Sequence, residues 1–172
     1  KRSSTKGNGS LLNDCDIASA RLSSANLKSA WGDFVDQVGE RKSGWDWYAT
    51  LTFRDRTDDE IARGWTKVGW KYAEKACNQF LGYLGELKGL NDTWWFRARE
   101  ISPWRGVPHW HLLIGGVEEL RRDDSWNWWF TRYGFARVLP YDRSLGARFY
   151  LCKYVTKELG DFRFSDNLKA IS

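Results

Sequence analysis

Alternating apolar and polar positions pick out four short segments of the chain as strands. Aromatic and β-branched residues fill 47–53 (WYATLTF), which predicts a buried strand. The same pattern predicts further strands over 93–101, 109–114 and 135–141. Pro103 to Pro108 is typical of a turn, so the second and third strands are expected to form a hairpin.

Apolar residues at helical spacing occupy the segments between these strands. They predict one or two short helices within 11–39, and longer helices over 60–88, 117–133 and 145–159. Asp58 and Asp59 are expected to cap the helix over 60–88, and Gly89 to end it. The resulting β-α-β-β-α-β-α order predicts an α+β fold, with a central antiparallel sheet of about five strands flanked by helices.

A chain of 172 residues is expected to form a single domain. The basic, low-complexity residues 1–10 are expected to be a disordered tail. The domain then covers 11–172, with 11–44 as an N-terminal helical extension and 45–172 as the core.

The bulk properties favour an anionic partner in an intracellular setting. The formal net charge is +5 and the pI is about 9.2. Cys15, Cys77 and Cys152 are odd in number and far apart, which favours reduced thiols in the cytoplasm. No apolar run approaches the roughly 20 residues of a membrane span, so no membrane partner is expected.

The two histidines of the chain stand in a His109-Trp110-His111 triplet. On a strand, residues i and i+2 point to the same face, so both imidazoles can converge on one cation. Glu100 ends the preceding strand, where a hairpin would bring its carboxylate beside them. Two histidines and a carboxylate leave ligand positions open, as in a catalytic metal site. The alternatives are a pair of partly buried strand histidines without a ligand, and a Glu100 that pairs with a nearby arginine.

Tyrosines and lysines share a face of the last predicted helix. Tyr150 and Tyr154 are four residues apart, and Lys153 and Lys157 each follow a tyrosine by three. Because the pKa of tyrosine lies near 10, a nearby cation favours the nucleophilic phenolate. The alternative is an amphipathic helix with half-buried tyrosines and solvated lysines.

Together these motifs resemble the HUH endonuclease superfamily, and specifically its rolling-circle replication initiators and related single-strand transposases. The resemblance covers about residues 45–165 in three ordered blocks: 48–53 (YATLTF), 100–116 with the P-H-W-H sequence, and 150–158. Conjugative relaxases place the tyrosine before the histidines, so the order here argues against that branch.

The resemblance implies an RRM-like sheet and a replication initiator that nicks single-stranded DNA at an origin. His109, His111 and Glu100 would bind one Mg²⁺ or Mn²⁺. Tyr154 would attack the scissile phosphate, assisted by Lys157, and give a 5′-phosphotyrosine and a free 3′-hydroxyl. The Y-x-x-x-Y spacing also resembles the two-tyrosine subgroup, in which Tyr150, beside Lys153, would be a second nucleophile.

A nuclease of this kind holds a single strand or an origin hairpin through arginine contacts to phosphates and aromatic contacts to bases. Host replication helicase or polymerase would be further partners, in the host cell of a plasmid, phage or mobile element. The residues expected to contact DNA are Arg97, Arg99, Trp104 and Arg105 near the metal, and Arg148 beside the tyrosine helix.

Three alternative functions remain open from the sequence. A transposase would use the same chemistry on element ends. A non-catalytic nucleic-acid-binding module would bind without cleaving and would be indifferent to chelators. A zinc-dependent hydrolase would use bound water as its nucleophile, so both tyrosines would be dispensable.

Overall fold

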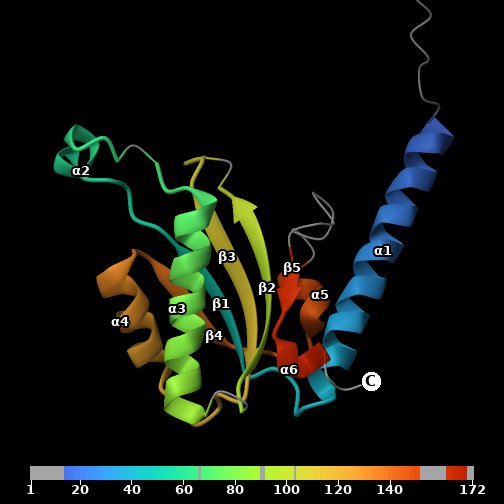
Figure 1. The fold of residues 1–172 in the computed structure, drawn as a ribbon. Helices are drawn as coiled ribbons and strands as arrows, with labels where there is room; N and C mark the ends of the chain where they lie inside the picture. The colour runs from blue at the N-terminus through green and yellow to red at the C-terminus, as the bar shows by residue number, and fades with distance from the viewer. Residues whose placement is uncertain (1–13, 66, 90–91, 103, 152–161, 170–172) are drawn as a thin grey trace, which may run out of the picture.

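The computed structural model describes residues 14–65, 67–89, 92–102, 104–151 and 162–169. These residues form five strands and six helices (Figure 1). In chain order the elements are α1 (Asp14–Glu40), β1 (Trp47–Thr52), α2 (Asp58–Ala62), α3 (Trp70–Lys88), β2 (Trp94–Ile101), β3 (Pro108–Gly115), α4 (Arg122–Arg132), β4 (Ala136–Pro140), α5 (Gly146–Leu151), β5 (Phe162–Phe164) and α6 (Asp166–Lys169).

The strands form one antiparallel sheet in the order β4-β1-β3-β2-β5. The predicted α+β fold and the five-strand antiparallel sheet are therefore confirmed. The β2-β3 hairpin is also confirmed, since these consecutive strands pair along their whole length. β3 is the central strand, with β1 and β2 on its two sides.

Helices cover both faces of the sheet (Figure 1). α3 and α4 pack on one face, whereas α1, α5 and α6 lie on the other. The α3/α4 face buries the larger core, which includes Trp110, Leu112 and Trp129. The α1/α5 face buries a second core around Val35 and Leu113. Each strand alternates between these two cores, because successive side chains point to opposite faces.

A close contact between α1 and α5 fixes the second layer of helices. A Cβ atom at Gly32 would lie 2.6 Å from Cβ of Arg148, so only glycine allows the two helices to come this near. The Asp36 carboxylate of α1 accepts hydrogen bonds from the backbone N–H of Ala147, at 2.8 Å, and from the Tyr141 hydroxyl, at 2.5 Å. Both contacts hold the start of α5 against α1.

The predicted helix over 60–88 is wrong in its first part. The chain forms the short helix α2, and α3 begins only at Trp70. Gly64, with a φ of +86°, follows α2, and Gly69 precedes α3. Thr57 caps α2 in place of the expected Asp58 or Asp59, because its hydroxyl accepts the N–H of Glu60 while the Glu60 carboxylate accepts the N–H of Thr57.

Three further features differ from the sequence-based expectation. The N-terminal segment is one helix of 27 residues rather than one or two short ones. The fifth strand, β5, and the short helix α6 were not predicted. Residues 1–10, expected to be a tail, lie outside the described residues.

Within the described part of the chain, no helix combines the length and the apolar character that a bilayer span needs.

Candidate functional site

The three predicted metal ligands lie on the same face of the sheet. Glu100 is paired directly with His109 across the β2-β3 hairpin, and Ala98 with His111. The indole of Trp110 points the opposite way and donates a hydrogen bond to the carbonyl of Ala73 in α3. The two imidazoles and the carboxylate therefore face the α1/α5 layer, and strand periodicity had predicted that the two histidines share a face.

His111 lies at the centre of this arrangement and is only 5% exposed. Its Nε2 atom is 3.3 Å from Oε2 of Glu100. On the other side of the ring, Nδ1 is 3.1 Å from the Tyr48 hydroxyl and 3.4 Å from Oγ1 of Thr50. Both nitrogens of this buried imidazole thus have polar partners, which fix the ring orientation.

His109 is more accessible and stands nearer the end of the strand. Its Nδ1 atom lies 2.9 Å from Oγ1 of Thr52, and its ring centroid is 6.3 Å from that of His111. Partial burial, together with the positive charge of Arg105, lowers the pKa of His109. The lowered pKa favours the neutral ring, the form in which histidine binds metals.

The imidazole nitrogens and the carboxylate oxygen are atoms of the kind that bind divalent cations. Two of them, in His111 and Glu100, also lie at a suitable distance from each other. Adjacent ligand atoms around a six-coordinate ion with bonds of ~2.1 Å lie about 3 Å apart, close to the separation of His111 Nε2 and Glu100 Oε2. The β1 hydroxyls contact the Nδ1 atoms of both imidazoles, and a polar partner on one ring nitrogen is the usual pattern around metal-binding histidines. Within the described residues, however, no three His, Cys, Asp or Glu side chains are grouped closely enough to hold a metal. The three side chains would have to move closer together to complete the set.

Tyr150 reaches the same face of the sheet from α5. Its ring packs against Tyr48, at a centroid distance of 4.7 Å, and against Tyr141, at 5.0 Å. Its hydroxyl accepts a hydrogen bond of 3.0 Å from the backbone N–H of Asp142. Tyr48 in turn stacks on His111 at 6.4 Å, so a single aromatic ring separates Tyr150 from that imidazole. The other residues of the predicted tyrosine block, Lys153, Tyr154 and Lys157, lie outside the described residues.

Arg97 and Arg99 do not lie where they were expected. Both are an odd number of positions from Glu100 along β2, so their side chains point to the α3/α4 face, away from the histidines. Arg97 is 3% exposed and pairs with Glu74 of α3, while Arg99 stacks over the Trp70 ring at 4.7 Å. Their expected position beside the metal ligands is therefore wrong, and strand parity alone would have revealed it.

The remaining predicted DNA contacts differ in their surroundings. Trp104 is 94% exposed in the β2-β3 turn. Arg105, in the same turn, donates hydrogen bonds to the carbonyl of Phe53 and to the Asp55 carboxylate, at 3.1 and 2.6 Å. Arg148 lies on α5 against α1 and donates a hydrogen bond of 3.5 Å to the Ser29 hydroxyl. The turn residues stand nearest the histidines, because the turn precedes His109 directly.

Sequence reasoning missed the contribution of β1 to the site. Tyr48, Thr50 and Thr52 alternate with Ala49 and Leu51, so their hydroxyls all point toward the histidines. The signal was present as three hydroxyl residues at period two within WYATLT.

Comparison with known proteins adds no assignment. No protein-family model, curated protein or solved structure matches the chain. The functional conclusion therefore depends on the sequence motifs and on the geometry of this site.

Proposed function

We propose that the chain is a metal-dependent nuclease of the HUH class, a replication initiator that nicks single-stranded DNA with a tyrosine nucleophile. One observation carries the proposal: His111 and Glu100 bring their donor atoms within 3.3 Å of each other on the sheet face that α5 covers. His109 stands on the same face, and Tyr154 and Lys157 follow α5 in the sequence.

The connectivity of the sheet supports an RRM-like fold of this class. The order β1-α3-β2-β3-α4-β4 places four strands as β4-β1-β3-β2, with α3 and α4 packed on one face (Figure 1). This order is similar to the split β-α-β arrangement of ferredoxin-like domains, whose open face binds nucleic acid in RRM proteins. Here the histidines of β3 face that side, partly covered by α1 and α5.

The proposed reaction is a transesterification at one phosphodiester. The Tyr154 oxygen bonds to phosphorus while the bond from phosphorus to the 3′ oxygen breaks, and the leaving oxygen takes up a proton to become the free 3′-hydroxyl. Lys157 stabilises the phenolate. His109, His111 and Glu100 would hold Mg²⁺ or Mn²⁺, which would supply charge to polarise the scissile phosphate. The 5′-phosphotyrosine conserves the bond energy for religation.

The surroundings of Tyr150 favour Tyr154 as the nucleophile. The Tyr150 ring is packed between Tyr48 and Tyr141, and its hydroxyl already accepts the N–H of Asp142. These contacts suit a residue that supports Tyr48 and, through it, His111. In this proposal Tyr150 holds the site together.

Formation of a covalent adduct tests the proposal. The protein is mixed with an end-labelled single-stranded DNA library of random central sequence in Mn²⁺, and SDS-resistant complexes are resolved by electrophoresis. We expect an adduct that EDTA abolishes, that His111→Ala and Tyr154→Phe lose, and that Tyr150→Phe retains. Tyr83→Phe is the matched control, because Tyr83 stacks on Trp128 on the opposite face.

Two results would overturn the proposal. The first is the absence of an adduct from the wild-type protein in both Mn²⁺ and Mg²⁺. The second is an adduct that survives in the Tyr150→Phe/Tyr154→Phe double variant. If the wild-type protein forms the adduct, sequencing the captured strands distinguishes two kinds of nuclease. An initiator selects one origin sequence, whereas a transposase selects element ends.

A non-catalytic nucleic-acid-binding module is the second candidate. This function is favoured by the direct contact of His111 with Glu100, which gives Nε2 of the imidazole a polar partner in the absence of a metal. This candidate predicts that the library is retained on the protein equally well in EDTA and in Mn²⁺, and that no strand is cut.

A further inference from the structure

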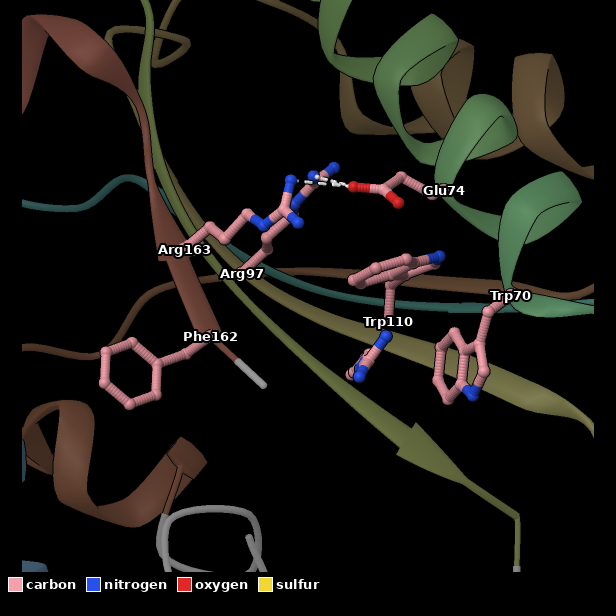
Figure 2. Close-up of a pocket in the computed structure, with 7 residues that line it drawn as sticks. Trp70, Glu74, Arg97, Trp110, Phe162 and Arg163 are labelled. Carbon is pink, nitrogen blue, oxygen red and sulfur yellow. Dashed lines mark hydrogen bonds and ion pairs between the residues drawn. The ribbon is translucent and has the colours of Figure 1, made fainter. Parts of the chain in front are cut away.

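A cationic pocket lies on the face of the sheet opposite to the histidines. It has a volume of about 90 Å³, and residues of α3, β2, β3 and β5 line it (Figure 2). The described lining residues carry three guanidinium groups and one carboxylate. They are Trp70, Glu74, Arg97, Arg99, Trp110, Phe162 and Arg163.

A single carboxylate oxygen lies between two of these guanidiniums. Oε1 of Glu74 accepts hydrogen bonds from Arg97, at 3.2 Å, and from Arg163, at 2.8 Å (Figure 2). The second terminal nitrogen of Arg97 donates to the side-chain carbonyl of Asn78 at 2.6 Å. One oxygen thus serves two cations that come from different strands, β2 and β5.

Arg97 is held rigidly and is incompletely satisfied. Its guanidinium carbon lies 5.0 Å from the Trp95 ring centroid and 4.9 Å from that of Trp110, so indoles flank it. Its Nε atom is buried and has no hydrogen-bond partner among the described residues. A buried donor without a conventional acceptor is costly, and an indole face is only a weak acceptor.

We propose that this pocket binds a phosphate group, with Arg97 and Arg163 as its principal donors. Paired guanidiniums match the geometry of phosphate oxygens, and Oε1 of Glu74 occupies the position that one such oxygen would take. Glu74 is 37% exposed and Arg163 67% exposed at the mouth, so the carboxylate is able to move aside. The volume of the pocket is well below the ~300 Å³ of small-molecule sites. The phosphate group therefore enters the pocket, and the rest of the molecule that bears it stays outside.

The phosphate belongs to a nucleic-acid backbone or to a free phosphate compound, and the net charge of +5 favours the backbone. Such a site would hold a strand on the face behind the histidines. It requires neither a metal nor a tyrosine, so it does not depend on the proposed nicking activity.

Titration with phosphate compounds tests the inference. EDTA is present, so that no metal at the histidine site contributes to binding. The probes are inorganic phosphate, thymidine 5′-monophosphate and a ten-residue oligothymidylate, and the readout is the NMR signal of the Arg97 side-chain Nε–H group. We expect the oligothymidylate to shift this signal at the lowest concentration. Arg163→Gln should weaken the response about tenfold, the loss expected for one charge-assisted hydrogen bond. Glu74→Gln should strengthen it severalfold, because the competing carboxylate charge is removed.

Arg132→Gln is the matched control, since Arg132 stacks over Trp128 on the exposed side of α4 and should leave the response unchanged. Thermal unfolding of each variant shows whether it is folded. The inference is overturned if no probe shifts the Arg97 signal, or if Arg163→Gln and Glu74→Gln leave the response as in the wild type. An equal response to inorganic phosphate and to oligothymidylate, at the same phosphate concentration, would overturn the nucleic-acid source.

Discussion

The hydroxyl of Tyr48 lies 3.1 Å from Nδ1 of His111, on the side of the imidazole opposite to Glu100. Thr50 donates a hydrogen bond of 3.2 Å to the same hydroxyl. The hydroxyl therefore fixes which ring nitrogen faces the carboxylate. This makes Tyr48 a positioning residue for the proposed metal ligand rather than a group that contacts the metal.

We predict that Tyr48→Phe weakens Mn²⁺ binding by 10-fold or more, the usual effect of removing a partner of a metal-binding histidine. The phenyl ring would keep its packing against Tyr150, so the fold should be retained. Isothermal titration with Mn²⁺ measures the affinity, and Tyr83→Phe serves as the control. Equal Mn²⁺ affinity in Tyr48→Phe and the wild type would show that the hydroxyl does not orient His111.

The Cys77 thiol should be inert in the folded protein. Complete burial in α3 raises its pKa to about 12, so almost no thiolate forms at pH 8. We predict that iodoacetamide leaves Cys77 unmodified under native conditions and alkylates it fully in urea. Peptide mass spectrometry after each treatment measures this directly. Native alkylation within minutes would mean that α3 opens readily from the sheet.

Strand periodicity located the site residues because β2 alternates over its second half and β3 begins with the His-Trp-His triplet. That alternation was enough to place His109, His111 and Glu100 on one face and Trp110 on the other. β5 escaped prediction because it has only three residues, Phe162–Phe164, too few for a period to be seen.

Other features depend on contacts that no local pattern encodes. Polar and glycine residues between α2 and α3 break the helix, although the apolar spacing continues through them. The partners of Arg97 come from α3, about 20 residues away, so the sequence could not reveal its ion pair with Glu74. The contact between Tyr48 and His111 joins residues 63 positions apart.

The capping box of α2 should give a distinctive acid response. The N–H of Thr57, and then the Arg54 guanidinium, lower the pKa of Glu60 from 4.5 to about 2. Because the folded-state pKa is depressed, the stabilisation by Glu60 is present above pH 4.5 and is lost as the pH falls toward 2. Glu60→Gln should therefore lower the melting temperature at pH 6, and most of this effect should disappear by pH 2.5.

Thermal unfolding of both proteins between pH 2.5 and 7 measures this difference. Arg54→Gln provides a partial control, since it should raise the pKa of Glu60 while leaving the Thr57 contact in place. A difference between Glu60→Gln and wild type that is constant across the whole range would contradict the assigned cause.

Gly116 closes β3 in a conformation that other residues rarely adopt. Its φ is +76°, and a Cβ atom there would lie 1.8 Å from the carbonyl oxygen of Asp92. The left-handed conformation alone costs a residue with a side chain about 1–2 kcal/mol, and the clash adds to it. We predict that Gly116→Ala destabilises the protein by at least 2 kcal/mol in urea denaturation.

Gly82→Ala is the control, because Gly82 lies in the middle of α3 with no atom within 4 Å of its added Cβ. This substitution should instead stabilise the protein by about 0.5–1 kcal/mol. The opposite signs separate backbone strain from any general effect of the added methyl group, and equal effects at the two positions would refute the argument.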